Sequence, residues 1–182
     1  MDYKFFYAEL FAPLEKRLGP IDRDTICAIV GFDGGGPLSF CTIGADQNKR
    51  HVTYISCELA IRDEQLPSEH GRYELVCTCD DEEWVRTVVS NVGRMSLETE
   101  LGHGHTVDIG PLLADDAPIQ AVLMTIEEQV EIAGERFAIY RVTGITRQEL
   151  NYAIKTDSES LLAVLKTHGF FPNTAIDRPS AV

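Results

Sequence analysis

The fold is decided by one stretch of the chain, YELVCTC at residues 73–79, which runs directly into DDEEWVRTVVSNVGRM at residues 80–95. The first seven residues alternate in polarity, which predicts a β-strand. Apolar residues then recur at three- and four-residue steps, which predicts an amphipathic helix with one buried face. One strand face carries Tyr73, Leu75, Cys77 and Cys79 and the other Val76, while the buried helix face carries Trp84, Val85, Val88, Val89 and Val92. This order is typical of a helix packed on a sheet.

The helices are marked by capping residues and stop signals. Asp80 is expected to cap the helix at 80–95, and Glu83 to reach back to it. Three further helices are predicted: a first with Phe5, Phe6, Leu10, Leu14 and Leu18 on one face, a second from the capping box of Thr146 and Glu149 to about Ile154, and a third from about Ser158 until Gly169. Gly19-Pro20 ends the first of these, because proline cannot continue a helical hydrogen-bond ladder.

Further strands are predicted on both sides of the opening stretch. They are Thr25–Val30, Leu38–Ile43, Val52–Ile61, Thr106–Ile109, Ala121–Thr125 and Arg136–Thr143, with a glycine-rich loop at Gly31–Pro37 and a polar turn at Asp46–Arg50. Several strands in hairpin-like succession, with helices at both ends, predict an α+β fold. We expect a single domain over residues 1–182, with a mixed, mostly antiparallel sheet and flanking helices.

The chain is strongly acidic, because 29 Asp and Glu residues against 16 Lys and Arg residues give a formal net charge of −13. Nucleic-acid binders need Lys and Arg to displace phosphate counterions, and the sequence has no basic stripe. We therefore expect no direct binding to DNA, RNA or anionic membranes. An acidic surface serves either solubility alone or the attraction of a basic protein partner.

Other features bear on the compartment. No apolar run approaches the roughly 18 residues of a membrane span, and the start of the chain does not resemble a secretory signal. Five cysteines, an odd number, do not form the pattern of a disulfide framework. These observations predict a cytoplasmic protein without a transmembrane segment.

Candidate sites for chemistry are few. The loop Gly31–Gly36 lacks the spacing and the following helix of a phosphate loop, so it predicts a turn. Cys77 and Cys79 with His103 and His105 could supply four zinc ligands, but one residue between paired cysteines is too few for a structural zinc site. We therefore expect no metal and no cofactor. His103 and His105 lie in a loop without a recognisable nucleophile motif, so exposed loop histidines are expected there.

Ordered short motifs link the chain to a family. They are Ser39–Gly44, Tyr73–Val76 followed by the acidic, Trp84-bearing helix, Leu101–Ile109, Ile145–Leu150, the helix around Leu161–Leu165, and Asp177-Arg178. Together, from about residue 35 to residue 180, they resemble the suppressor-of-fused domain in its stand-alone bacterial form. The resemblance implies an α/β fold with a mixed sheet, and a function in binding other proteins rather than in catalysis.

The resemblance also implies a role. Stand-alone bacterial versions are thought to be immunity proteins of polymorphic toxin systems, which bind and neutralise a toxin, and an acidic inhibitor suits a basic toxin. Candidate partner-binding residues, chosen for polarity and loop position, are Asp46, His103, His105, Asp115, Asp116 and Arg178. Two alternatives remain: a small metal-dependent or histidine-using hydrolase, and a general protein-interaction regulator. Catalytic residues are not expected, and the oligomeric state does not follow from the sequence.

Overall fold

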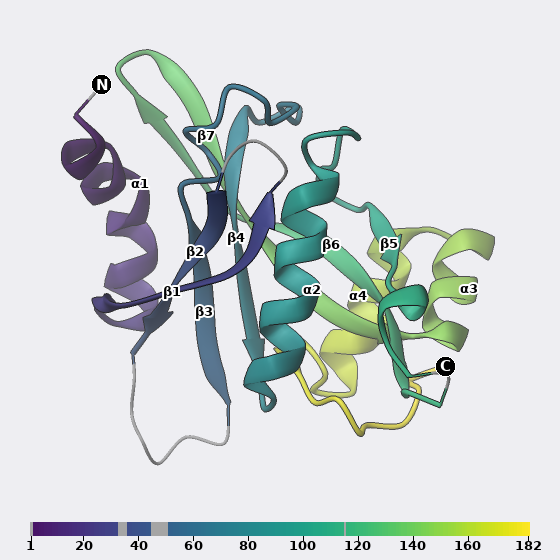
Figure 1. Ribbon diagram of the computed structural model, residues 1–182. Coiled ribbons are helices and arrows are strands. Elements are labelled where there is room, and N and C mark those ends of the chain that lie inside the picture. The colour runs from purple at the N-terminus through teal and green to yellow at the C-terminus, as the bar shows by residue number, and fades with distance from the viewer. Residues whose placement is uncertain (1, 33–35, 45–50, 115) are drawn as a thin grey trace.

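The computed structural model describes residues 2–32, 36–44, 51–114 and 116–182, and for residues 23–32 and 36–38 it describes the backbone alone. Figure 1 shows one twisted sheet with helices on both of its faces. The helices are α1 (Tyr3–Leu18), α2 (Glu82–Met95), α3 (Arg147–Lys155) and α4 (Ser158–Thr167), with a short 3₁₀ turn η1 (Gly110–Leu112). The strands are β1 (Ile21–Phe32), β2 (Gly36–Ile43), β3 (Val52–Cys57), β4 (Arg72–Cys79), β5 (Thr106–Asp108), β6 (Ile119–Ile132), β7 (Glu135–Thr146) and β8 (Asn173–Thr174).

The sheet has the strand order β1-β2-β3-β4-β7-β6-β5, with β8 beside the end of β4. Neighbouring strands are antiparallel except for β4 with β7 and β4 with β8, which are parallel. The predicted α+β fold with a mixed, mostly antiparallel sheet and flanking helices is therefore confirmed.

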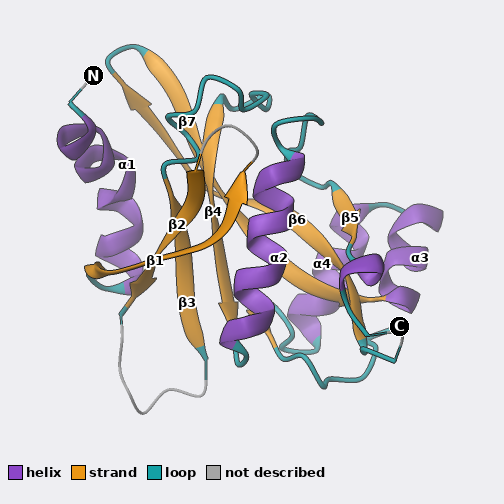
Figure 2. Cartoon of the chain, in the orientation of Figure 1, coloured by secondary structure: helices purple, strands orange, loops and turns teal. Residues whose placement is uncertain are grey.

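The alternation of β4 divides the core between the two sheet faces. Tyr73, Leu75, Cys77 and Cys79 face α2 in one apolar cluster, whereas Val76 faces α1 in another. On the α1 side of the sheet, α3 and α4 cover the far end, where Leu123 and Ile145 pack against them. Figure 2 shows this arrangement, with α2 in front of the strands and α1 at one edge.

Two details predicted for the helices are wrong. Asp81 rather than Asp80 caps α2, since its Oδ1 accepts the N–H of Trp84 at 2.7 Å, while Asp80 Oδ1 accepts the N–H of Ile176. Phe5 is 59% exposed, and the buried face of α1 turns instead through Phe6, Leu10, Phe11 and Leu14.

Two strand ends also differ from the prediction. β3 ends at Cys57 because Glu58 adopts a left-handed φ of 77° that turns the chain away from the ladder. β6 runs on to Ile132, because it pairs with β7 as far as the turn at Ala133-Gly134. The predicted turn at 46–50 lies outside the described residues.

Gly144 allows β7 to lie close to its neighbours. A Cβ at this position would lie 2.6 Å from Thr174 Cγ2 and 3.1 Å from Trp84 Cη2. Gly144→Ala is therefore expected to lower the free energy of unfolding by about 1–3 kcal/mol, as overpacking does. Urea denaturation measures this, and Gly102→Ala, whose Cβ would meet no atom closer than 3.7 Å, is the control. Equal midpoints for the two variants would contradict the packing argument.

Candidate partner-binding site

A polar hollow of about 160 Å³ lies where the loop before β4 meets the loop between α2 and β5. Its lining is Ser68, Glu69, Glu100, Leu101, Gly102, His103 and His105. The second loop is fixed to β6 by two backbone hydrogen bonds: Gly104 N–H donates to Met124 O, and Met124 N–H donates to His105 O. Two predicted residues, His103 and His105, therefore lie together beside two glutamates, and this hollow is the candidate site.

His103 is held by both of its ring nitrogens. Its Nδ1 accepts the backbone N–H of Ile126 at 3.0 Å, and its Nε2 lies 2.7 Å from Oε1 of Glu159 on α4. This geometry requires the ring proton to be on Nε2, which donates to Glu159. His103 is thus a bridge between β6 and α4, and neither nitrogen is available to move a proton on a substrate.

His105 and the two glutamates form the accessible rim of the hollow. His105 and Glu100 are exposed, and the side chain of Glu69 is 63% exposed with His70 at 3.4 Å. Sequence reasoning missed Glu69 and Glu100, because each is a single acid in a loop without a motif. Packing of the two loops brings Glu69 to His105, whereas Glu100 lies in the same loop as His105.

The remaining predicted contacts lie elsewhere. Asp116 is exposed in the loop after η1, at the opposite end of the β5–β6 pair from His105. Asp46 and Asp115 lie outside the described residues. A partner contact at Asp116 therefore stays a prediction, at a distance from the hollow.

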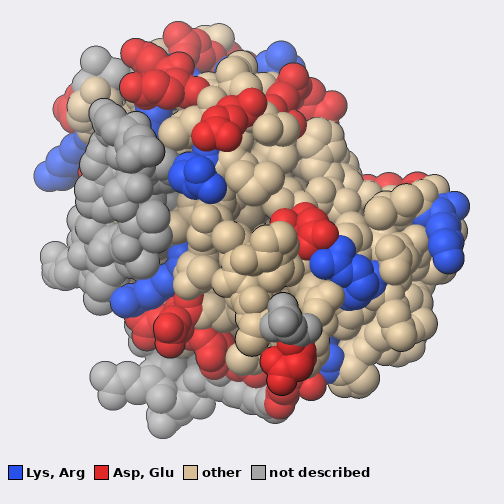
Figure 3. Space-filling view, turned by 45° about the vertical axis from the view of Figure 1, so that its right-hand side comes forward, with Lys and Arg blue, Asp and Glu red and all other residues tan. Residues whose placement is uncertain are grey.

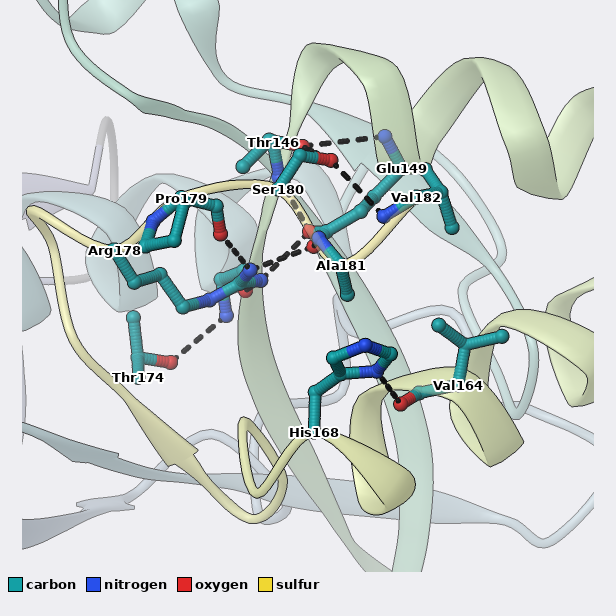
Figure 4. Close-up of polar contacts among 11 residues, drawn as sticks. Thr146, Glu149, Val164, His168, Thr174, Arg178, Pro179, Ser180, Ala181 and Val182 are labelled. Carbon is teal, nitrogen blue, oxygen red and sulfur yellow. Dashed lines mark hydrogen bonds and ion pairs between the residues drawn. The ribbon is translucent and has the colours of Figure 1, made fainter.

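Arg178 lies in the interior, 4% exposed. Its Nη1 and Nη2 each lie 2.6 Å from one oxygen of Glu149, and Nη2 also donates to Gly144 O at 3.0 Å. Figure 4 shows the guanidinium directed from the C-terminal segment at this carboxylate. Its partner role stays a prediction, but both of its Nη atoms are engaged within the chain.

Glu149 is ionised in this pair. Burial opposes its charge, but the hydrogen bonds from Arg178 and from the N–H groups of Thr146 and Ala181 outweigh burial and lower the pKa of Glu149. The bond to Thr146 belongs to the predicted capping box, which is confirmed. The carboxylate therefore joins the start of α3 to the C-terminal segment.

Glu74 is a second buried carboxyl, on the α1 side of β4. It is fully buried and accepts hydrogen bonds from Tyr7 Oη at 2.8 Å, from Ala60 N at 2.9 Å and from Ser56 Oγ. Burial raises the pKa of Glu74 to about 8, although these donors favour the charged form. The carboxyl is therefore protonated in the folded protein at neutral pH.

A pH dependence of stability follows from Glu74. The pKa is about 8 in the folded protein against an ordinary 4.5, so the native state binds more protons than the unfolded state between these values. Its contribution to stability is fully present below the ordinary value and is lost as pH rises toward 8, by up to about 1.4 kcal/mol per pH unit. Glu74→Gln, which is always neutral, should flatten this decline in urea titrations across that range. Glu9→Gln, on an exposed position of α1, should keep the wild-type slope, and equal slopes for all three proteins would contradict the assignment.

The residues weighed and set aside as zinc ligands lie in different surroundings, since His103 and His105 line the polar hollow. Cys77 and Cys79 are buried under α2, where burial raises the pKa of both thiols, that of Cys79 to about 12. In the described residues, no group of three or more His, Cys, Asp or Glu side chains could hold a metal ion. No helix of the described chain is long and apolar enough to cross a membrane.

Comparison with known proteins identifies the family. The model of the family described as suppressor of fused protein (SUFU) matches residues 34–179. No curated protein sequence matches this chain. Among solved structures, the chain is similar to one in the Sufu–Fu complex, with a TM-score of 0.70 and 15% identity, covering 98% of this chain and 91% of that chain.

Two further structures share the fold. A putative SUFU homologue from Neisseria gonorrhoeae FA 1090 has a TM-score of 0.64 and 16% identity, with 98% of each chain covered. Drosophila Suppressor of Fused has a TM-score of 0.61 and 16% identity over 81% of this chain and 44% of that chain. The matched segment spans most of the chain and agrees with the resemblance seen in the sequence. This chain belongs to the suppressor-of-fused family.

Proposed function

We propose that this protein is a non-catalytic protein-binding domain, and that the polar hollow receives a basic side chain of the partner. The observation that carries the proposal is the rim of Glu69, Glu100 and His105 around an open space of about 160 Å³. A space of this size accepts one lysine or arginine head group, and paired carboxylates are its natural acceptors. The family supports this class of function, since a similarly folded chain has been solved in a Sufu–Fu complex.

The charge of the whole molecule favours a basic partner. The formal net charge is −13, and Figure 3 shows acidic side chains in larger groups than the basic ones on one face. A field of one sign speeds the encounter with a partner of the other sign and selects against acidic proteins. The hollow would then fix the orientation of a partner that this field attracts.

The finer proposal is that the protein is a cytoplasmic immunity protein that neutralises a cognate toxin. A nucleic-acid-cleaving toxin needs a basic surface, and an acidic inhibitor masks such a surface by complementarity. A general interaction regulator would use the same hollow, and the identity of the captured protein separates the two roles. The histidine-based hydrolase has less support, because both ring nitrogens of His103 are engaged.

The test is capture of partners from lysate of the source cell, followed by affinity measurement with the purified partner. We expect one dominant basic protein whose binding weakens with salt. The double variant Glu69→Lys/Glu100→Lys should raise Kd by about tenfold or more, because rim charge reversals replace attraction with repulsion. Glu9→Lys/Glu131→Lys makes the same charge change at exposed positions outside the hollow and should have a smaller effect.

Each result has a clear meaning. Equal increases in Kd for the two double variants would contradict a role for the hollow. Partner binding would then depend only on the net negative charge of the protein. A toxin role also requires that co-expression with the captured protein rescues growth. A purified protein that ignores every protein encoded beside its gene would contradict the immunity role.

A further inference from the structure

A second hollow, of about 290 Å³, opens between α1 and the neighbouring strands β2 and β3. One wall is formed by residues of α1, namely Tyr3, Lys4, Tyr7 and Phe11, and Cys41 and Cys57 form part of the opposite wall. We call it the thiol pocket. It is largely apolar and large enough to admit a small organic molecule.

The two cysteines come together through the register of β2 and β3. Cys41 pairs with Ile55, and Cys57 pairs with Ser39. The cysteines are therefore offset by two residues, which places them on the same face of the sheet. Their sulfur atoms lie 3.2 Å apart, so a small movement would bring them to bonding distance. Cys77 and Cys79, by contrast, lie next to each other along one strand on the opposite face.

Exposure differs between the two thiols. Cys41 is 2% exposed, whereas Cys57 is half-buried at the end of β3. Of the two thiols that line the thiol pocket, Cys57 is therefore the more accessible to a bound molecule. Such a difference suits a pair in which the accessible thiol forms a mixed disulfide with the ligand and the second thiol then attacks that disulfide.

We propose that Cys41 and Cys57 are a modification site, a dithiol that a low-molecular-weight disulfide of the glutathione type oxidises to an intramolecular disulfide. The Cys57 thiolate attacks one sulfur of the ligand, a new S–S bond forms, and the first ligand thiol leaves with the proton that Cys57 gave up. The Cys41 thiolate then attacks Sγ of Cys57, and the second ligand thiol leaves in the same way. Two protein thiols are oxidised and one ligand disulfide is reduced to two thiols.

The surroundings make this exchange slow and selective. The hydrogen bond with Cys41 and burial both raise the pKa of the Cys57 thiol, so little of the reactive thiolate is present at neutral pH. The second step is favoured by the position of Cys41. A thiol held in contact with the mixed disulfide attacks it faster than a free ligand thiol does. The site should therefore respond to sustained oxidation rather than to brief exposure.

The experiment incubates the folded wild-type protein with oxidised glutathione at mildly alkaline pH, then alkylates it under denaturing conditions. We expect the number of alkylated thiols to fall from five to three, and peptide mass spectrometry to find Cys41 linked to Cys57. Added dithiothreitol should restore all five. The oxidised protein should also have a higher urea midpoint, because the new bond closes a loop in the unfolded chain.

Two variants test the order of steps. Cys41→Ser should accumulate a glutathione adduct on Cys57, and Cys57→Ser should leave Cys41 reduced. A Cys27→Ser protein should form the same disulfide between Cys41 and Cys57 as the wild-type protein. The proposal is overturned if wild-type Cys41 and Cys57 stay reduced while an unfolded control is oxidised, or if another pair links as readily. Because the main result comes from wild-type protein, a variant that fails to fold does not affect it.

Discussion

Arg178→Ala is expected to lower the free energy of unfolding by about 3–5 kcal/mol, because it leaves a buried carboxylate without its cation. Glu149 is fully buried, and both of its oxygens contact the guanidinium at 2.6 Å. The arginine also covers Phe170, with its central carbon 4.4 Å from the ring centre. Urea or guanidinium denaturation followed by circular dichroism measures the loss.

A double-mutant cycle separates the ion pair from packing. Arg178→Met keeps much of the apolar stem, and Glu149→Gln removes the charge while it keeps the shape. The double variant should be more stable than the sum of the two single losses predicts, because no unpaired charge remains. Additive losses would show that the pair is not coupled.

The Arg178 prediction also has a pH signature. The pKa of Glu149 is lowered in the folded protein, so its contribution is present above the ordinary value of 4.5 and is lost as pH falls below it. Wild type should therefore lose stability in acid. Arg178→Ala should lose less over the same interval, since protonation relieves its unpaired carboxylate.

Arg141→Ala should lower the free energy of unfolding by about 3 kcal/mol, the lower end of the range for a broken buried pair. Arg141 is 1% exposed, and its Nε lies 2.6 Å from Glu127 Oε2. Its Nη1 also donates to Thr78 Oγ1 at 3.0 Å. The expected effect is smaller than for Arg178, because Arg17 remains 2.6 Å from the other oxygen of Glu127.

Arg17→Ala is the matched control for Arg141. It removes a cation from the same carboxylate, but the Arg17 side chain is 46% exposed, and such ion pairs contribute about 0–1 kcal/mol. Thermal or urea unfolding of the two variants under identical conditions gives the comparison. Similar losses would mean that burial does not decide the strength of this network.

Periodicity predicted those parts of the fold that depend on neighbours along the chain. The β4 alternation and the apolar face of α2 place Tyr73 and Trp84 in the core as expected. The Thr146 capping box is also local, so it could be predicted. The choice between Asp80 and Asp81 as the cap of α2 could not be predicted. Asp80 accepts a hydrogen bond from the backbone N–H of Ile176, almost a hundred residues away.

The candidate site was predictable only in part, for the same reason. His103 and His105 stand out in the sequence, but Glu69 joins them through the packing of two loops. Arg178 is buried together with Glu149, its ion-pair partner. The predicted loop position of Arg178 does not reveal this long-range contact. Likewise, Cys41 and Cys57 become neighbours through the β2–β3 register, which spacing alone does not give.

The parallel pair of β4 and β7 has a consequence for the kinetics of folding. Strands β1 to β4 pair antiparallel with sequential neighbours, and so do β6 and β7. Each half of the sheet can therefore form from strands that follow one another along the chain. Joining the halves requires residues 72–76 to meet residues 137–141, and closing so long a loop is entropically slow. We therefore expect the union of the two halves to be the slow step of folding, and until it occurs β4 has an unpaired edge that is open to other chains.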